Sequence, residues 1–503
     1  MKSLLGAGRA GMVPVLLAAL LVACGGGGGG GEPTPTNGSG GTGTSGGGTA
    51  GNPPRIEPYE SVQLLSFKAD ASRTASGPQV SPSAVTLPPL DAGSAAAAKS
   101  HNANASAATA RQVGQARPVA AAADAAATAR LLRWQRTPKG ELAAATSFRS
   151  EGAASVRLGL LVDRLPPQAV VRVMSPAGQD LSEATGEQIH ALLARNPDTD
   201  ADARTYWFPS VGGQDVVLEI ALPPGADPAQ VKVAVPRLSH LWVDLTRGED
   251  SFLKIGESST CNIDASCEAS YLDESRAVAR VEFVSEGSAF LCTGTLMADV
   301  AASGTPWFLS ARHCISDQSS AATVVTYWFY RSSTCNSGVL GPQSVRLGGG
   351  ATLLYEAAAT DTAFLRLERN PPAGVLFAGS LLAAPAAGTS VIGLHHPVGD
   401  LLKFSLGSIL GYANCTENSS GSVGCGQAGD NFASVRWSRG TTQRGSSGSA
   451  IFTPLGSNAY VTAHLYAGLA SCLRPDEPDY YGRFDIPYRS ALHQYLGDVP
   501  GAR

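Results

Sequence analysis

Stretches in which apolar and polar residues alternate recur through residues 146–250 of the chain. Alternation with a period of two is typical of β-strands that bury one face, and Pro- and Gly-rich turns such as residues 223–225 separate these stretches. A helical pattern over residues 182–195 interrupts them. The pattern therefore predicts a small β-sandwich-like domain with one helix. Its expected strands lie at residues 154–160, 169–173, 216–220, 231–235 and 241–245.

The same kind of pattern fills residues 255–503, with Gly-rich loops between the apolar stretches. Helical periodicity in this part is clear only over residues 487–496. We therefore expect an all-β domain that ends in a short C-terminal helix. Its clearest strands are predicted at residues 277–284, 305–309, 323–330, 363–367, 390–394, 450–452 and 460–464.

The first residues of the chain predict an export signal. Lys2 and Arg9 precede an apolar run over residues 12–23, which is shorter than the roughly 20 residues that a membrane-spanning helix needs. A signal peptide over residues 1–23 is therefore expected. It ends in Leu-Val-Ala before Cys24, and this motif resembles the lipobox of bacterial lipoproteins. The resemblance implies a lipid on the Cys24 thiol; the alternative is an ordinary signal peptide followed by a chance cysteine.

A lipidated cysteine implies an exported bacterial lipoprotein at the outer membrane or cell surface, with release to the extracellular space after cleavage left open. Residues 24–55 consist largely of Gly, Ser, Thr and Pro, so a disordered tether is expected there. Residues 56–145 are interpreted as a low-complexity linker or propeptide segment. Within it, residues 59–67 have the pattern of a strand, residues 72–129 are expected to be a disordered spacer, and the alanine-rich residues 95–129 are interpreted as a linker or a loose helix.

Composition and charge narrow the class of protein. The chain has 503 residues, of which 43% are hydrophobic and 16% are charged, and its formal net charge is −4. This balance excludes a wholly disordered chain and gives no sign of nucleic-acid binding. The nine cysteines are an odd number. If Cys24 carries a lipid, eight remain for disulfides in an oxidising compartment.

Three segments carry candidate chemistry. Glycines flank Ser447 in the string GSSGSA at residues 445–450, where a sharp turn would expose the hydroxyl beside converging amides, as acyl transfer requires. His313 follows an apolar strand in the string FLSARHC at 308–314, next to Cys314, and Asp361 precedes another apolar strand. A carboxylate that fixes the imidazole tautomer completes a catalytic triad. The chain order His, Asp, Ser is the order of the chymotrypsin fold.

Residues 256–495 resemble a trypsin-like serine protease of the chymotrypsin fold, and most closely the bacterial lysyl endopeptidases. The strings that carry the resemblance cover about half of the chain in order. They are CNIDASC at 261–267, CTGTL at 292–296, FLSARHC at 308–314, VVTYWFYRSSTC at 324–335, TDTAFLRL at 360–367, GSSGSAIF at 445–452 and YGRF at 481–484.

This resemblance implies a chymotrypsin-like double β-barrel and a serine endopeptidase that needs no cofactor or metal. Its substrates would be proteins or peptides, and the chain would be monomeric. Ser447 resembles the nucleophile, His313 the general base and Asp361 the residue that orients it. The amides of Gly445 and Ser447 would form the oxyanion hole.

The resemblance also implies a disulfide pattern. Three pairs follow from the family, and the remaining two cysteines would close an additional hairpin-like loop. The implied pairs are Cys261–Cys472, Cys267–Cys335, Cys292–Cys314 and Cys415–Cys425.

Substrate preference depends on a pocket carboxylate. Six residues before the nucleophile, where the usual trypsin pocket has Asp, this chain has Thr441. Lysyl endopeptidases instead place the Asp just before a Tyr-Gly-Arg, which indicates Asp479 here and a preference for Lys, or Arg, before the scissile bond. Asp476 and Glu477 compete for this role. Tyr466 stands where the family has a pocket-flanking His, which leaves strict Lys preference open.

The residue before the nucleophile is Ser446 and not the Asp that pairs with a freed N-terminus in most trypsin-like zymogens. That activation switch is therefore not expected. Removal of residues 56–254 as a propeptide is the alternative, and Lys254-Ile255 precedes the family's mature start, which makes self-cleavage there a hypothesis.

Two other classes of function stay in view. A surface-anchored adhesin or binding module on an inactive protease scaffold would also have this architecture. An esterase-like hydrolase is disfavoured, because no G-x-S-x-G motif follows a strand–helix pattern in the required order. His395-His396 has no third ligand nearby in sequence, so no metal site is expected.

Overall fold

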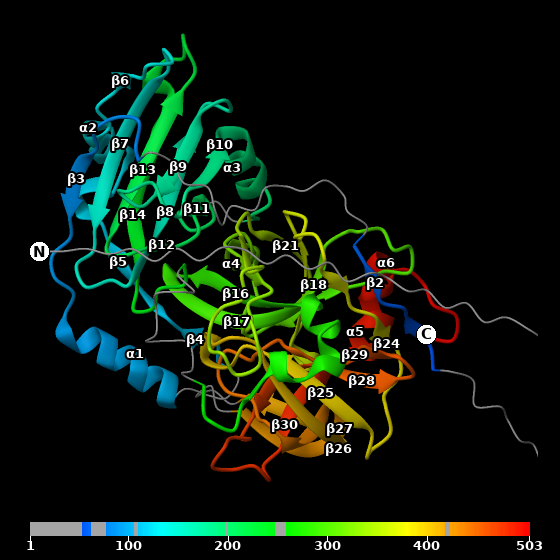
Figure 1. Cartoon of the computed structure of the whole chain (residues 1–503). Helices are drawn as coiled ribbons and strands as arrows, with labels where there is room; N and C mark the ends of the chain where they lie inside the picture. Colours follow the sequence, from blue (N-terminus) through cyan, green and yellow to red (C-terminus); the bar gives the residue numbers. More distant parts are fainter. Residues whose placement is uncertain are drawn as a thin grey trace, which may run out of the picture. The chain divides into compact units, whose positions relative to one another are not determined.

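The computed structural model describes residues 53–61, 77–104, 109–197, 200–246, 258–417 and 423–502 (Figure 1). The expected signal peptide and almost the whole expected tether lie outside these residues. The described part is built mainly from β-strands, which confirms the all-β class. Within it, no helix has the length and apolar character needed to span a membrane.

The N-terminal domain consists of two sheets. The first has the order β10 (Ser182–Thr185), β9 (Val170–Met174), β13 (Asp215–Leu222), β7 (Leu142–Arg149) and β3 (Ser83–Thr86), with β6 (Gln135–Arg136) also paired to β7. The second has the order β11 (Thr205–Trp207), β8 (Ser155–Arg164), β14 (Lys232–Leu241) and β5 (Gly114–Pro118), with β12 (Val211–Gly212) also paired to β8.

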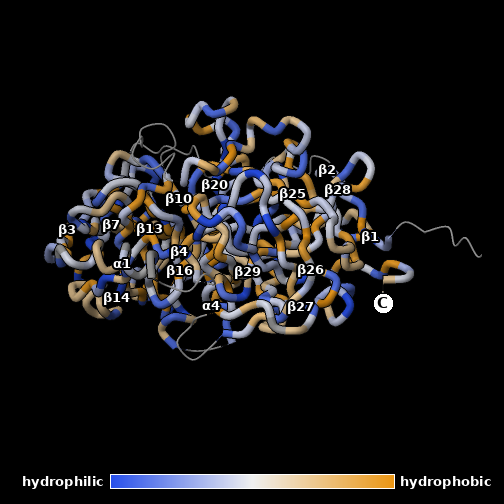
Figure 2. The backbone as a smooth tube through the Cα atoms, turned by 90° about the horizontal axis from the view of Figure 1, so that it is seen from below, coloured by the Kyte–Doolittle hydropathy of each residue, from blue (hydrophilic) through white to orange (hydrophobic). Residues whose placement is uncertain are grey.

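The two sheets bury alternate residues against one another. Leu158 of β8, Val173 of β9, Leu218 of β13 and Val235 of β14 are all buried in a single hydrophobic cluster. Figure 2 shows hydrophobic and hydrophilic segments alternating along the chain through these strands. The sheets therefore form the small sandwich that the alternation predicts.

Two predicted elements of this domain differ from the structure. Strand β14 runs continuously from Lys232 to Leu241, because a register shift near Ala234 keeps it paired with β8, and the predicted strand at 241–245 is wrong. The predicted helix at 182–195 is shorter, since α3 covers Gly186–Leu193. The residues before it pair with β9, and Thr185 caps the helix through a reciprocal contact with Gln188.

The predicted spacer at 72–129 is also wrong where the structure describes it. Residues 83–86 and 114–118 form strands of the two sheets, and α1 (Ala92–Asn104) and α2 (Ala125–Leu131) lie in the same region. Strand β3 pairs in parallel with β7, and strand β5 pairs antiparallel with the distant β14. The partners of these two strands therefore cannot be predicted from the local sequence. The ordered domain therefore begins well before residue 146.

The C-terminal domain contains two large sheets. The first has the order β20 (Val345–Leu347), β19 (Val325–Trp328), β16 (Val278–Ser285), β17 (Ser288–Met297), β18 (Trp307–Ala311), β22 (Thr362–Leu367) and β21 (Ala351–Ala357). The single turn α4 (Gln318–Ala321) precedes β19. Strand β4 (Arg111–Gln112), from the N-terminal part of the chain, also pairs with β17.

The second large sheet closes on itself. Its central order is β29 (Asn458–Gly468), β28 (Ala450–Leu455), β25 (Ser390–His395), β26 (Lys403–Glu417), β27 (Val423–Arg439) and β30 (Asp479–Arg483). Because β30 also pairs with β29, these six strands form a closed barrel. Attached to it are β24 (Ser380–Leu381), β1 (Arg55–Ile56) and β15 (Ile263–Asp264). Strand β2 (Tyr59–Glu60) pairs separately with β23 (Leu376–Phe377).

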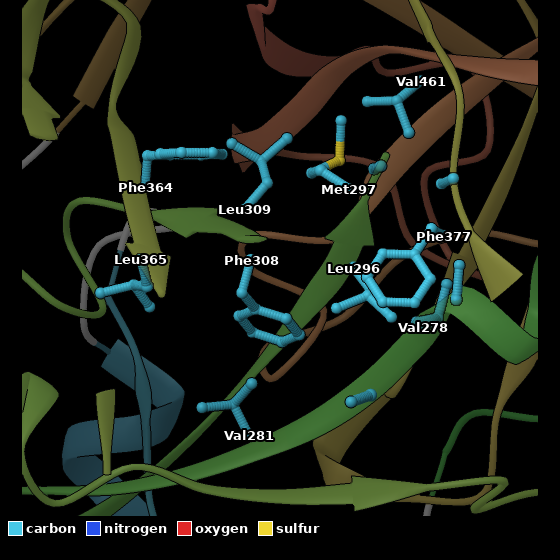
Figure 3. Packing of buried hydrophobic residues seen from close by; sticks show 14 of the residues in the cluster. Val278, Val281, Leu296, Met297, Phe308, Leu309, Phe364, Leu365, Phe377 and Val461 are labelled. Carbon is cyan, nitrogen blue, oxygen red and sulfur yellow. The ribbon is translucent and has the colours of Figure 1, made fainter. Parts of the chain in front are cut away.

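A short helical segment ends the domain, as the sequence predicts. It consists of α5 (Asp485–Pro487), a π-helical turn (Tyr488–Leu492) and α6 (His493–Leu496). One hydrophobic cluster joins both sheets and this segment. Figure 3 shows part of this cluster, with Phe308, Leu309 and Phe364 from the first sheet and Val461 from the second. A shared core fixes the ends of these strands relative to one another.

A buried ion pair joins the N-terminal and C-terminal domains. Arg157 Nη1 lies 3.1 Å from Glu282 Oε1, and both side chains are fully buried. The other carboxylate oxygen of Glu282 accepts hydrogen bonds from Tyr327 and Ser210, while Arg157 also donates to the carbonyls of Phe208 and Thr323. Each charge is therefore neutralised and hydrogen-bonded from both domains.

Removing one partner should be far more costly than breaking an exposed pair. Arg157→Met leaves the Glu282 carboxylate buried without a counter-ion, so we expect the free energy of unfolding to fall by about 3–5 kcal/mol. Arg149→Met is the matched control, since the Arg149–Asp215 pair is largely exposed and should contribute less than about 1 kcal/mol. Urea unfolding followed by tryptophan fluorescence measures both, and equal losses would contradict this assignment.

Candidate active site

His313 lies directly after strand β18, which ends at Ala311. The neighbouring Cys314 forms a disulfide with Cys292 of strand β17. The disulfide attaches the histidine segment to β17, the strand paired with β18 in the same sheet. The His313 side chain is largely buried.

Asp361 holds the histidine by two hydrogen bonds. Its Oδ1 accepts from the His313 amide at 2.9 Å, and its Oδ2 accepts from the ring Nδ1 at 2.7 Å. Asp361 has a left-handed backbone conformation (φ +52°), which Asp tolerates better than most residues and which ends a short 3-10 turn before β22. Because Nδ1 donates to the carboxylate, the neutral ring has an acceptor at Nε2. This Nε2 is buried and makes no hydrogen bond within the described residues.

Ser447 lies in a turn that precedes strand β28 and packs against the histidine segment. Its carbonyl accepts from the Thr293 amide at 2.8 Å, one residue after the disulfide-bonded Cys292. A side chain at Gly448 would collide with Ser310 and the Thr293 carbonyl, so only glycine permits this approach. Strand β17, which holds Cys292, and strand β18, which precedes His313, therefore also contact the turn that contains Ser447.

The backbone of this turn presents two amides. Among the described residues, the amides of Gly445 and Ser447 donate to no other group. Gly445 has φ +95°, and its carbonyl accepts from the Thr293 hydroxyl at 2.8 Å. On its other side the turn is held by the Val398 amide, which donates to Arg444. Fixed amides of this kind can stabilise an oxyanion.

Ser446, the residue before Ser447, is hydrogen-bonded to a buried histidine. Its hydroxyl contacts His395 Nδ1 at 2.8 Å, and His395 Nε2 contacts the Ser405 hydroxyl at 3.1 Å. Ser405 in turn donates to the Thr441 carbonyl. Burial lowers the pKa of His395 to about 3, so the ring is neutral at physiological pH. The serine turn is thus fixed by a neutral hydrogen-bond network within the domain.

A pocket of about 390 Å³ opens beside Ser447. Strand β29, the loop that follows it and the residues before the nucleophile form its walls. The lining residues are Thr442, Gln443, Arg444, Ser447, Leu465, Ala467, Gly468, Leu469, Ala470, Ser471 and Arg474.

Asp479 lies behind the wall of this pocket. Its carboxylate accepts hydrogen bonds from Thr442 Oγ1 at 2.7 Å and from the Ala470 amide at 3.2 Å, and both donors belong to pocket-lining residues. A third donor is Trp437 Nε1 at 2.7 Å. The side chain is fully buried, and desolvation raises the pKa of Asp479 to about 6 although these hydrogen bonds favour the charged form.

The other predicted pocket residues are placed differently. Thr441 is buried and does not line the pocket, whereas its neighbour Thr442 does. Asp476 and Glu477 are exposed and also do not line it. Tyr466 lies between two rings, 5.0 Å from Phe432 and 6.0 Å from His313 by their centroids. Sequence reasoning did not find Trp437 and Thr442 as partners of Asp479, because only strand pairing brings them to the carboxylate.

All four implied disulfides are present in the structure, between the cysteine pairs that the sequence analysis named. The His395-His396 pair is buried, and His396 Nδ1 contacts the Asp400 carbonyl. Another buried serine–histidine contact, Ser150–His240, lies in the N-terminal domain. Arg117 donates to that serine, and burial lowers the pKa of His240 to about 4, so this contact serves packing.

Sequence comparison identifies the family. Residues 255–482 match the model of the lysyl endopeptidase C-terminal domain, and residues 86–242 match that of the lysyl endopeptidase N-terminal domain. The chain is also 31% identical over 383 residues to the lysyl endopeptidase of Pseudomonas aeruginosa, covering 73% of this chain and 77% of that protein. The chain belongs to the lysyl endopeptidase family.

As a member of the lysyl endopeptidase family, the protein is a serine endopeptidase. Solved protease structures match about half of the chain at low sequence identity. The thermostable serine protease AL20 from an extremophilic microorganism is 16% identical, with a TM-score of 0.30 over 44% of this chain and 98% of that one. The MamO protease domain from Magnetospirillum magneticum is 8% identical, with a TM-score of 0.31 over 44% of this chain and 98% of that one.

The Ser446 network generates a stability prediction for this lysyl endopeptidase family member. Ser446→Ala leaves a ring nitrogen of His395 buried without a partner, so the free energy of unfolding should fall by about 1–3 kcal/mol. Ser333→Ala, which removes an exposed hydroxyl contact, is the control and should change it by less than about 0.5 kcal/mol. Thermal unfolding of the two variants beside the parent tests this; an unchanged melting temperature for Ser446→Ala would refute it.

Proposed function

We propose that this endopeptidase uses Ser447 as nucleophile, His313 as general base and acid, and Asp361 as the residue that positions His313. The observation that carries the proposal is the pair of hydrogen bonds that Asp361 accepts from the amide and the ring of His313, next to the turn that holds Ser447. This contact fixes the ring tautomer that can accept a proton at Nε2.

In the first half of the reaction, Ser447 Oγ attacks the carbonyl carbon of the substrate and its proton passes to His313 Nε2. The carbonyl oxygen becomes an oxyanion, which the amides of Gly445 and Ser447 stabilise. The C–N bond then breaks, His313 gives its proton to the leaving amine, and the acyl group stays on Ser447 as an ester. Water hydrolyses this ester by the same steps, with His313 again taking and returning the proton.

The pocket beside Ser447 is proposed to bind a Lys, or Arg, side chain before the scissile bond. Asp479 supplies the negative charge for recognition through the wall formed by Thr442 and Ala470. Lysine preference is also supported by the name of the Pseudomonas aeruginosa relative. Tyr466 would flank the substrate at the other side, since its ring lies beside His313.

The chain is further proposed to be made as an exported precursor, with a lipid on Cys24 and cleavage after Lys254 in a reaction of the protease itself. The apolar run before Cys24 and the glycine-rich segment after it support the anchor. The match of a separate N-terminal family domain to residues 86–242, ahead of the match that starts at 255, supports the cleavage position. Metabolic labelling with an alkyne fatty acid, compared between the parent and Cys24→Ser, tests the anchor.

Removing the nucleophile tests the catalytic assignment. Ser447→Ala is expected to lower kcat on a lysyl peptide substrate by about 10⁶-fold, as loss of a triad member does elsewhere. A fluorophosphonate probe should label the parent chain and not this variant. The neighbouring Ser449→Ala serves as control and should keep probe labelling. Labelling of Ser447→Ala at the parent level would overturn the assignment and favour a different nucleophile.

The raised pKa of Asp479 predicts how cation binding depends on pH. Below about pH 6 the free pocket holds a neutral carboxyl, so the affinity for a charged alkylamine inhibitor should fall as pH drops, approaching tenfold per pH unit. The inhibition constant of pentylamine between pH 5 and about 8 measures this. Pentanol, which carries no charge, is the matched control ligand.

Substitution of Asp479 should remove the pH dependence of pentylamine binding and should also weaken substrate recognition. Asp479→Asn is expected to lower kcat/KM for a lysyl substrate by about 2–5 kcal/mol of transition-state binding, or roughly 30- to 5,000-fold. Asp476→Asn, at an exposed carboxylate, should leave kcat/KM unchanged. If Asp476→Asn instead produced the larger loss, the pocket carboxylate would have to be reassigned.

A further inference from the structure

The residues at the start of the described chain bind to the C-terminal domain, although the whole N-terminal domain follows them in sequence. Residues 54–61, which we call the clip, form strands β1 and β2. Strand β1 pairs antiparallel with β24, and β2 pairs antiparallel with β23. The Leu382 amide donates to Pro54 at one end, and the Ser61 amide donates to Val375 at the other. The clip thus extends a sheet edge by strand addition.

Side chains of the clip are part of the C-terminal domain's core. Ile56 is 2% exposed and belongs to the hydrophobic cluster that joins both sheets of that domain. Tyr59 stacks on Phe377 with 4.7 Å between ring centroids and planes 8° apart, and its hydroxyl accepts from the Gly304 amide at 3.1 Å. Burial raises the pKa of Tyr59 to about 12.

Polar contacts surround these two anchors. Glu57 accepts a hydrogen bond from the Tyr460 hydroxyl at 2.6 Å, and Glu60 forms an ion pair with Arg276 at 2.6 Å. An interface with buried apolar anchors inside a polar rim is the arrangement that gives specific binding. The clip lies outside both ranges that match the family models, 86–242 and 255–482.

We propose that the clip keeps the catalytic domain bound to the lipid-anchored N-terminal segment after the chain is cut at Lys254. This inference rests on the anchor and cleavage in the proposed function. Cleavage after Lys254 separates the clip from the C-terminal domain along the chain, so their covalent link is lost. The strand pairing remains, and so do the contacts of the two anchoring side chains, Ile56 and Tyr59. Pro54, the first residue of the clip, lies 30 residues after Cys24 along the chain. The protease would therefore stay at the membrane through a non-covalent contact.

In the decisive experiment, two cuts in the chain separate the clip covalently from the N-terminal domain and that domain from the C-terminal domain. A full-length Ser447→Ala chain carries an affinity tag within residues 32–50 and sites for an unrelated, site-specific protease within residues 62–76 and 247–257. After both cuts, the tagged clip fragment is captured and the bound C-terminal domain is quantified. We expect the C-terminal domain to be captured with the tag. Its appearance in the unbound fraction, with both cuts complete, would overturn the proposal.

Variants of the clip supply the controls. Ile56→Asp combined with Tyr59→Ala places a carboxylate in the core position and removes the stacked ring, so capture should fall at least about tenfold. Arg55→Ala is the milder control: its ion pair with Glu57 lies within the clip, and its contact with the Tyr460 ring, 5.4 Å from the ring centroid, is a weak one across the interface. Equal capture by the double variant and the parent would show that other contacts hold the domain and would refute the clip.

The capture experiment distinguishes a failure of the clip from a failure of the proposed function. The cuts are made by an external protease in an inactive chain, so the result does not depend on the triad, on self-cleavage or on the lipid. In cells making the active chain, the C-terminal domain should sediment with membranes, and less of it should do so in the Ile56→Asp/Tyr59→Ala variant, in which contacts of the N-terminal domain such as Arg157–Glu282 still hold part of it. Capture in vitro without membrane retention in cells would indicate that the anchor or the cleavage, and not the clip, is wrong.

Discussion

The active site depends on the two hydrogen bonds that the Asp361 carboxylate accepts from His313. One bond fixes the backbone after strand β18 and the other fixes the ring, so a single buried carboxylate sets both the position and the tautomer of the imidazole. Asp361 can do this because its left-handed backbone turns the chain just before strand β22. Strands β18 and β22 are paired along their length, which gives the two residues a common rigid support.

Several buried polar networks share this design, in which each group is paired within the fold. His395 is neutral and links Ser446 to Ser405, so the serine turn needs no incoming N-terminus to become ordered. Glu282 and Arg157 neutralise each other where the N-terminal and C-terminal domains meet. Since each network would be costly to leave half satisfied, it specifies one arrangement of the segments that it joins. The N-terminal domain and the clip are thus fitted to the same C-terminal core that supports the active site.

The strands of the C-terminal domain were well predicted, because alternation marks a strand that has one buried face. Strands β26 and β27 were not predicted as such, although the hairpin-like loop expected at Cys415 and Cys425 lies in the hairpin that they form, and the order of the N-terminal sheets was not predicted. Residues 72–129 were interpreted as a spacer because their alanine-rich composition has little contrast between polar and apolar positions. Their strands exist because distant partners, β7 and β14, accept them. The Tyr59–Glu60 pairing is likewise decided by β23, far along the chain.

The sequence by itself determined the all-β class, the candidate triad in its chain order, the family resemblance and the cysteine pairs that it implies. Residue types and short sequence strings define these features, so they can be recognised before the three-dimensional structure is known. Only the tertiary structure decided which side chains meet: that Trp437 and Thr442 hold Asp479, that His395 holds Ser446, and that Ile56 enters a core built mainly by the C-terminal domain. Such contacts form between distant strands, and their energy depends on burial and on partners that no local pattern records.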